Sequence, residues 1–450
     1  MRIRPARRIN GHLSLPGDKA ISHRAAIISA LSSGTSRIEN FSTADDCVAT
    51  LACLKKMGVG VKFETGGKAL LIEGVGLEGL RAPRSPLDCR NSGSTMRMLA
   101  GVLAGQSFEA VLTGDESLRE RPMNRIIKPL ELMGARVESN EGRAPLRING
   151  SRPLKAISYE MPVASAQVKT CILLAGLFAN GRTEVIESSG RTRDHTERML
   201  HCYGVDIKTS DLQNANLLSN KISLEPPAEL KAHDGAIAGD ISSAAFFIAA
   251  AALLPGSKLE IKRVGLNPTR TQFLSTLRSL GADIRQELID YGGWIDFPDF
   301  NEIYGDLFVD GGPGLAPTEE GESNVLRGAL IPQLIDELPM LAVLGTQVIG
   351  GLTIRDASEL RLKETDRIAA TVENLRAMGV EVEEHEDGLT ILSRTRLRGA
   401  RLDSHGDHRI AMAFSVAALV AEGDSEIEGA DCVSVSFPEF YTLLESVVER

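Results

Sequence analysis

One structural unit recurs along the whole chain: a helix with one apolar face, then a glycine, then a short strand of alternating apolar and polar residues. Each glycine suits the left-handed position that ends a helix. The glycines lie 76, 70, 77 and 98 residues apart, so units of about 75 residues fill the 450-residue chain. A sixth helix near residue 450 has no such glycine and strand after it. The five complete copies span residues 47–63, 123–139, 195–209, 269–286 and 365–384, with glycines at 58, 134, 204, 281 and 379.

A second set of helical segments lies between these copies and is rich in alanine with almost no charge. Such segments are typical of buried helices, because a helix that is apolar all round has no face for water. Each unit thus carries one half-exposed helix, one buried helix and several strands. Six units divide naturally into two α/β domains of about 220 residues that meet near residues 234–240. A cleft between two domains is a usual ligand site.

Composition excludes several classes of function. The net charge of −10 opposes a nucleic acid or an anionic membrane surface as the main partner. The longest apolar run, Ala244 to Leu254, is far shorter than the roughly 20 residues that span a bilayer, and the first residues contain no apolar signal segment. The six cysteines are scattered, without the spacing of a zinc site. We therefore expect a soluble cytoplasmic protein with reduced thiols.

Basic and small polar residues gather where buried helices begin in the first half of the chain. The stretch LPGDKAISHR (15–24) places Lys19 and Arg24 at a helix start, and NSGSTMR (91–97) places Gly93 where a ligand can approach the backbone closely. Backbone N–H groups at a helix N-terminus attract anions, and nearby cations add to the attraction. Taken alone, each stretch also fits an ordinary capped helix. Further examples are Arg121 in RERPM, Ser165 and Gln167 in ASAQVK, and Arg193 in TRDHTE.

The second half repeats this layout with acidic residues added. Asp336 lies in the apolar stretch IPQLIDELPML, where a carboxylate needs a partner or a raised pKa, so it is a candidate base. Lys363, Glu364 and Arg367 follow in LKETDR, and Arg409 follows in GDHRIAM. The recurrence of cationic helix starts in an acidic chain predicts a site for anionic substrates.

The order of these motifs resembles that of the 5-enolpyruvylshikimate-3-phosphate synthase family of enolpyruvyl transferases, over essentially the whole chain. The resemblance implies an inside-out α/β barrel of two domains, each with three βαβαββ repeats and buried helices. One domain would span 14–237 and the other 1–13 plus 238–450, with the active site in the cleft between them. The motifs are LPGDKAISHR, NSGSTMR, RERPM, ASAQVK, TRDHTE, IDELP, LKETDR and GDHRIAM.

The resemblance also implies the reaction. Members of this family transfer the enolpyruvyl group of phosphoenolpyruvate to the 5-hydroxyl of shikimate 3-phosphate and release phosphate. This step belongs to the shikimate pathway, which leads to chorismate and the aromatic amino acids. A monomer without metal or organic cofactor is implied, with glyphosate as an inhibitor.

The family's site residues carry over by position. Lys19 resembles the lysine that touches both substrates, and Arg24 the arginine that holds the shikimate carboxylate. Asp336 and Lys363 would contact the shikimate hydroxyls. The set implied for shikimate 3-phosphate is Lys19, Ala20, Arg24, Ser165, Ala166, Gln167, Arg193, Asp336 and Lys363, and the set for phosphoenolpyruvate is Lys19, Gly93, Arg121, Gln167, Arg367 and Arg409.

The implied chemistry is addition followed by elimination. Asp336 is our candidate for the base that takes the 5-hydroxyl proton as its oxygen attacks C2 of phosphoenolpyruvate. Glu364 and Lys19 are the candidates for the acid that protonates C3. Cations around the intermediate would stabilise its anionic groups while phosphate leaves.

The chain departs from the family pattern at two positions. Ala20 stands where the family usually has a serine whose hydroxyl binds the shikimate carboxylate, which predicts weaker binding of shikimate 3-phosphate. Val435 stands where one branch has a lysine near phosphoenolpyruvate. Affinity for phosphoenolpyruvate and glyphosate is therefore left open by the sequence.

Two other functions are compatible with parts of the sequence. The sister enzyme that transfers enolpyruvate to UDP-N-acetylglucosamine shares the fold and chemistry, but it typically carries a reactive cysteine in the loop that reads GDESLRER here. The other alternative is a non-catalytic repeat scaffold in which Asp336 and Glu364 are structural.

Overall fold

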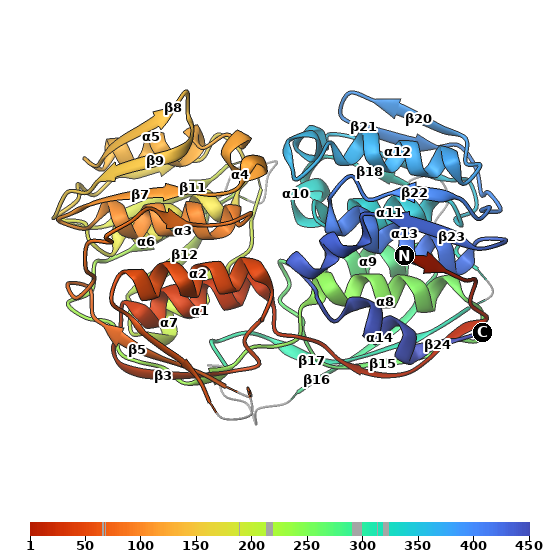
Figure 1. Ribbon diagram of the computed structural model, residues 1–450, viewed down its shortest axis with the longest axis horizontal. Helices are drawn as coiled ribbons and strands as arrows, with labels where there is room; N and C mark the ends of the chain where they lie inside the picture. The colour runs from red at the N-terminus through yellow and green to blue at the C-terminus, as the bar shows by residue number, and fades with distance from the viewer. Residues whose placement is uncertain are drawn as a thin grey trace. The chain divides into compact units, whose positions relative to one another are not determined.

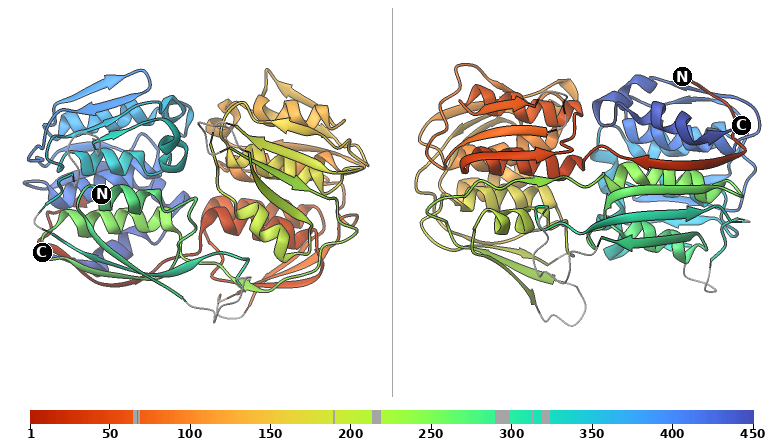
Figure 2. Two further views of the ribbon diagram at one scale, coloured as in Figure 1. Left: turned by 180° about the vertical axis from the view of Figure 1, so that it is seen from behind. Right: turned by 90° about the horizontal axis from the view of Figure 1, so that it is seen from below.

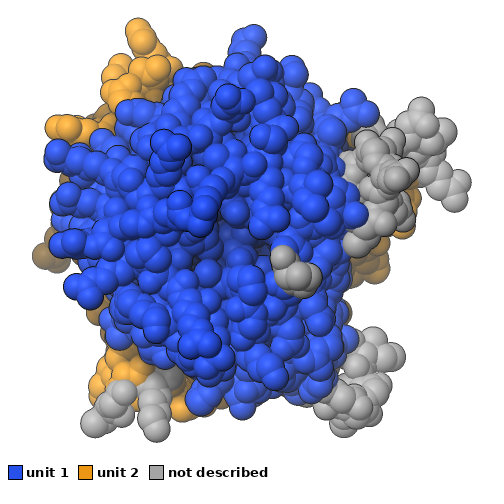
Figure 3. All heavy atoms as spheres, turned by 90° about the vertical axis from the view of Figure 1, so that its right-hand side faces the viewer, with its two compact units in different colours: residues 1–16, 238–292, 303–450 blue, residues 17–237, 293–302 orange. Residues whose placement is uncertain are grey.

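The chain divides into two compact units, each built from separate stretches of sequence. The computed structural model describes residues 1–64, 67, 69–188, 190–212, 219–289, 299–312, 314–317 and 324–450. Unit 1 comprises residues 1–16, 238–292 and 303–450, coloured blue in Figure 3, and unit 2 comprises residues 17–237 and 293–302.

Unit 2 contains three successive sets of alternating strands and helices (Figure 1). The first set is α1 (Lys19–Ala30), β3 (Ser33–Glu39), α2 (Asp45–Lys56), β4 (Gly60–Phe63) and β5 (Ala69–Val75). The second is β6 (Leu87–Asp88), α3 (Gly93–Ala104), β7 (Glu109–Thr113), α4 (Glu116–Glu120), α5 (Asn124–Leu132), β8 (Arg136–Asn140) and β9 (Arg143–Asn149). The third is β10 (Ser158–Glu160), α6 (Ala166–Gly176), β11 (Thr183–Glu187), α7 (His195–Cys202), β12 (Ile207–Leu212) and β13 (Ser219–Leu224), followed by β14 (Gly235–Ala236).

Unit 1 repeats this order. Its first set is β2 (Arg8–Ser14), α8 (Ile241–Leu253), β15 (Lys258–Gly265), α9 (Gln272–Ser279), β16 (Asp283–Leu288) and β17 (Tyr304–Asp310). The second is β18 (Val325–Leu326), η1 (Gly328–Leu330), α10 (Ile331–Leu334), α11 (Leu338–Gly345), β19 (Leu352–Ile354), η2 (Ser358–Leu362), α12 (Arg367–Ala377), β20 (Val382–His385) and β21 (Gly388–Ile391). The third is β22 (Arg401–Asp403), α13 (His408–Val420), β23 (Ser425–Glu428), η3 (Ala430–Val435), α14 (Phe440–Val447), β24 (Val448–Glu449) and β1 (Arg2–Ile3).

The described residues form six small mixed sheets, and each sheet contains one parallel pair of strands that is extended by antiparallel pairing. Five of them end in an antiparallel hairpin, as in the order β6-β7-β9-β8, where β6 and β7 are parallel. In unit 1, Figure 2 shows β2, β15, β17 and β16 as one layer. These sheets and helices confirm the mixed α/β class expected from the sequence.

The leading strand of the first sheet in each unit comes from a distant part of the chain. In unit 2, β14 pairs in parallel with β3, and in unit 1, β2 pairs in parallel with β15. The sixth helix, which lacked a strand of its own in the sequence, is followed by β24, which pairs with β2. The sheet of that last set is completed by β1, which pairs antiparallel with β23. Residues from both ends of the chain therefore close unit 1.

The repeat glycines adopt the backbone conformation expected of them. All five have φ between 84° and 98°, in the left-handed region that side chains with a Cβ avoid. Each ends its helix and turns the chain into the following strand. The predicted units therefore have the helix and strand boundaries that their glycines indicated.

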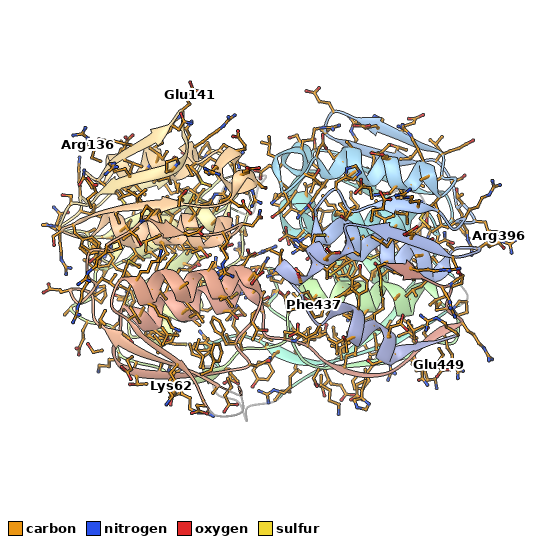
Figure 4. All side chains as sticks on the ribbon, viewed as in Figure 1. Lys62, Arg136, Glu141, Arg396, Phe437 and Glu449 are labelled. Carbon is orange, nitrogen blue, oxygen red and sulfur yellow. The ribbon has the colours of Figure 1, made fainter. Side chains whose placement is uncertain are left out.

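Each unit has its own apolar core, built around the alanine-rich helices. In unit 1, the C-terminal segment packs on α8 through aromatic rings. The Phe437 ring, labelled in Figure 4, lies 6.1 Å from the Phe247 ring and 5.8 Å from the Phe440 ring, centroid to centroid. In unit 2, α3 and α6 approach so closely that a Cβ on Gly101 would lie 2.2 Å from the Cys171 carbonyl oxygen. Small residues thus permit helix packing that larger ones would prevent.

Among the described helices, none is by itself long and apolar enough to cross a membrane. The two helical segments 328–334 and 338–345 meet that criterion only when they are taken together, and the chain bends by 110° between them.

We predict that Gly101→Ala destabilises unit 2. The added methyl group meets backbone, which cannot rotate away, so the free energy of unfolding should fall by about 2 kcal/mol. Urea unfolding followed by circular dichroism measures this fall. Gly181→Ala is the control, because the nearest atom to its Cβ would be 3.7 Å away. Equal unfolding midpoints for the two variants would contradict this packing.

Candidate functional site

The residues predicted from sequence form two groups, one in each unit, and most lie at or near helix N-termini. At such ends the first backbone N–H groups have no partner within the helix, so they favour negative charge. In unit 2 the group comprises Lys19, Ala20, Arg24, Gly93, Arg121, Ser165, Ala166, Gln167 and Arg193, and in unit 1 it comprises Asp336, Lys363, Glu364, Arg367 and Arg409.

The start of α1 combines a helix cap with an ion pair. The Asp18 carboxylate accepts a hydrogen bond from the Ile21 N–H at 3.0 Å. The Lys19 Nζ donates to Asp46 Oδ2 at 2.8 Å, and both side chains are largely covered. The ion pair holds the Lys19 ammonium at the helix start.

Arg24 is almost completely buried and is held by neutral acceptors. Its Nε donates to Thr196 Oγ1 at 2.7 Å, its Nη2 to Thr170 Oγ1 at 2.8 Å, and its Nη1 to the Ala20 carbonyl at 2.8 Å. Burial lowers the pKa of Arg24 to about 10, while Glu197 acts in the opposite direction and Arg193 adds to the lowering. The guanidinium thus stays charged at neutral pH.

Gly93 begins α3 beside two guanidinium groups. Ser92 caps this helix by accepting from the Thr95 N–H at 3.1 Å. A Cβ on Gly93 would lie 2.7 Å from Arg97 Nη1 and 3.4 Å from Arg121 Nη1. The absence of a side chain at Gly93 therefore leaves room beside both cations.

Arg97 is a site residue that the sequence reasoning missed. Its Nη1 donates to Gln167 Oε1 at 2.7 Å, and Gln167 Nε2 donates to Ser94 Oγ at 2.9 Å. These contacts join the start of α3 to the start of α6, which Ser165 caps. The available signal was the place of Arg97 in NSGSTMR, one helical turn after Gly93.

The remaining predicted residues of unit 2 lie beside these groups. Ala166 is the first residue of α6, and its carbonyl accepts from Thr170 Oγ1 at 2.8 Å. Arg121 Nη2 donates to Asn91 Oδ1 at 2.6 Å. Arg193 lies just before α7 and is close enough to Arg24 to affect its pKa.

In unit 1, Asp336 lies between two arginines. Its Oδ1 is 3.8 Å from Arg367 Nη1, and its Oδ2 is 3.8 Å from Arg409 Nη2. Arg409 Nη1 also donates to the Asp336 backbone carbonyl at 2.8 Å. The structure therefore brings the candidate base together with two of the predicted cations.

Arg367 is buried and paired with carboxylates. Its Nε donates to Asp407 Oδ2 at 2.7 Å, and its Nη2 donates to Glu364 Oε2 at 2.6 Å. Burial alone would lower the pKa of Arg367, but Asp407 and Glu364 outweigh it and raise that pKa. Asp407 also caps α13 by accepting from the Arg409 N–H at 2.8 Å.

Lys363 follows η2 directly and is half-buried. Burial lowers the pKa of its ammonium, and the negative charge of Asp336 opposes that lowering. Lys363, Asp336, Glu364, Arg367 and Arg409 thus form one cluster of charged groups. No cluster of three or more His, Cys, Asp or Glu suited to a metal ion occurs among the residues that the structure describes.

Comparison with known proteins gives consistent matches over the full length. The family model described as EPSP synthase (3-phosphoshikimate 1-carboxyvinyltransferase) matches residues 3–444. A 3-phosphoshikimate 1-carboxyvinyltransferase of Solibacter usitatus is 49% identical and one of Koribacter versatilis is 48% identical, each alignment covering 100% of this chain and 99% of the relative. A solved structure of EPSP synthase from Acinetobacter baumannii matches with a TM-score of 0.83 at 38% identity, covering 99% of this chain and 98% of that one.

These matches bear out the family and the activity expected from the motifs. They favour the shikimate-pathway transferase over both the nucleotide-sugar enzyme and the scaffold. With its fold, its cationic helix starts and its full-length relatives, the chain belongs to the EPSP synthase (3-phosphoshikimate 1-carboxyvinyltransferase) family.

Proposed function

We propose that the two charged clusters act together as one active site. The units would correspond to domains 14–237 and 1–13 plus 238–450 of an inside-out α/β barrel with three βαβαββ repeats in each domain. Shikimate 3-phosphate and phosphoenolpyruvate carry two phosphates and two carboxylates between them. Helix N-termini lined with guanidinium and ammonium groups suit that charge.

We propose that shikimate 3-phosphate binds mainly through its carboxylate and phosphate. Arg24 would hold the carboxylate, because its neutral partners leave its charge available. Ser165, Gln167 and Arg193 would face the phosphate and the ring. Lys19, Ala20, Ala166, Asp336 and Lys363 would complete this subsite.

Phosphoenolpyruvate would lie against guanidinium groups from both clusters. Arg121, Arg367 and Arg409 suit its carboxylate and phosphate, because planar guanidinium groups bind such anions through two parallel hydrogen bonds. Gly93 would leave space for it beside Arg121. Lys19 and Gln167 would complete the set.

The position of Asp336 between Arg367 and Arg409 is the observation that carries the mechanism. The two cations favour its ionised form, which is the form a base requires. Asp336 would take the proton of the 5-hydroxyl as that oxygen attacks C2. Glu364 or Lys19 would deliver a proton to C3. In the elimination, a proton would leave C3 and another would pass to the phosphate oxygen as the C2–O bond to phosphate breaks.

We also propose that the protein acts in the cytoplasm as a monomer. All six cysteines are free thiols, as in a reducing compartment. Exposed large apolar side chains such as Phe63, Leu132 and Leu288 lie on separate elements, β4, α5 and β16. Such dispersed side chains are typical of a surface that faces water.

We predict that Asp336→Asn lowers kcat by about 10² to 10⁴-fold, because the amide cannot accept the hydroxyl proton. The assay is phosphate release from phosphoenolpyruvate, with shikimate 3-phosphate and UDP-N-acetylglucosamine as parallel acceptors. Release should require shikimate 3-phosphate. Asp424→Asn, at an exposed ion pair with Arg2, is the matched control. Full activity of Asp336→Asn would exclude it as the base.

We predict that Ala20→Ser lowers the KM for shikimate 3-phosphate. The new hydroxyl supplies a donor to the substrate carboxylate, worth about 1 to 2 kcal/mol, or roughly 5 to 30-fold in KM. Steady-state kinetics with each substrate varied in turn measure the change. An unchanged KM would show that position 20 does not face the carboxylate.

We predict that Gly93→Ala raises the KM for phosphoenolpyruvate by about tenfold, because its methyl group displaces the Arg97 guanidinium and fills the space beside Arg121. The KM for shikimate 3-phosphate should change less than about twofold. Equal rises in the KM values for both substrates would contradict the placement of Gly93 beside phosphoenolpyruvate.

A further inference from the structure

We propose that Thr170 and Thr196 are positioning residues that prepare Arg24 for the carboxylate of shikimate 3-phosphate. The inference rests on the proposed role of Arg24 and deepens it. Neither threonine would touch the substrate. Their hydroxyls would act by fixing the orientation of the guanidinium and by leaving its charge unneutralised.

The direction of every hydrogen bond in this group follows from counting protons. A threonine hydroxyl has one hydrogen to donate. Thr170 Oγ1 donates its hydrogen to the Ala166 carbonyl at 2.8 Å. It therefore accepts from Arg24 Nη2 and, at 2.6 Å, from the Thr196 hydroxyl. Thr196 Oγ1 in turn accepts from Arg24 Nε. The chain of bonds has only one arrangement, so Arg24 has a fixed orientation.

The same count gives the number of Arg24 N–H donors that remain for a ligand. A guanidinium has five N–H donors. Thr196, Thr170 and the Ala20 carbonyl take three of them, one each on Nε, Nη2 and Nη1. One N–H on each terminal nitrogen remains beyond these contacts. Two such donors match the two oxygens of a carboxylate.

Neutral acceptors distinguish Arg24 from Arg367, the other fully buried arginine of the proposed site. Arg367 donates to the Asp407 and Glu364 carboxylates, which neutralise it. Arg24 donates to two hydroxyls and a carbonyl, and burial lowers its pKa to about 10. A buried cation without a directly bonded anion gains much by binding one. The two threonines thus orient Arg24 without competing with the substrate for its charge.

The position of Thr196 is fixed by its neighbours on both sides in the first turn of α7. His195 Nδ1 lies 2.6 Å from Glu302 Oε1, and Glu197 Oε1 lies 2.7 Å from Lys169 Nζ. All four side chains are buried. Lys169 precedes Thr170 on α6, so its ion pair with Glu197 also sets the spacing of the two threonines. Such support is characteristic of a preorganised binding group.

The test compares variants by their KM for each substrate. Thr196→Val keeps the shape but removes the acceptor, and we expect the KM for shikimate 3-phosphate to rise about tenfold. The KM for phosphoenolpyruvate should change less than about twofold, and Thr196→Ser should restore the original values. Thr170→Val should act like Thr196→Val. Thr183→Val is the matched control, because the buried Thr183 hydroxyl has no hydrogen-bond partner among the described residues.

A second measurement ties the effect to the carboxylate. Calorimetric titration compares the binding of shikimate 3-phosphate with that of its carboxylate methyl ester. Relative to the unaltered protein, Thr196→Val should bind shikimate 3-phosphate about tenfold more weakly and should bind the ester equally well. Equal weakening of both ligands, or equal rises in both KM values, would overturn the inference. The variant Arg24→Lys distinguishes a failure of the proposed Arg24 role from a failure of the positioning role of the threonines. If it leaves binding of the acid intact, the proposed role of Arg24 fails; if it weakens binding while Thr196→Val does not, only the positioning role fails.

Discussion

The placement of buried helix N-termini is the constraint on which the rest of this structure depends. A buried helix needs acceptors for its terminal N–H groups, because water cannot supply them in a core. Asp18, Ser92 and Ser165 supply these acceptors in unit 2, and Asp240 and Asp407 supply them in unit 1. Groups that cap the helices thus stand beside the cations that would bind substrate. Fold stability and anion binding use the same ends of the same helices.

The cations at these ends are held in two ways. Lys19 and Arg367 pair with carboxylates, whereas Arg24 is held by hydroxyls and a carbonyl. A carboxylate that pairs with a cation fixes the position of the cation, but it also weakens the attraction of that cation for a substrate anion. An arginine with neutral partners keeps its charge for a ligand, and the surrounding fold must hold it there. In unit 2, the buried contacts of α6 and α7 hold Arg24 in place.

The sequence predicted the repeat helices, their closing glycines and the location of the candidate residues at helix starts, because each leaves a local pattern. The resemblance implied that residues 1–13 join the second domain, but the pairing of β2 with β15 and of β14 with β3 was not predicted, since a short parallel strand carries no sign of its distant partner. Thr170 and Thr196 resemble ordinary core residues, so their contact with Arg24 was equally hidden. The carboxylate that neutralises each cation depends on tertiary packing, as Asp46 and Asp407 show.

The most direct measurement of the central claim is a crystal structure with shikimate 3-phosphate and a non-reactive analogue of phosphoenolpyruvate. We predict that the shikimate carboxylate accepts two hydrogen bonds from Arg24, while Thr170 and Thr196 keep their hydrogen bonds to Arg24. We also predict that Asp336 lies within hydrogen-bond distance of the 5-hydroxyl. A complex in which both ligands contact one unit only, or in which Arg24 faces no carboxylate, would contradict these predictions.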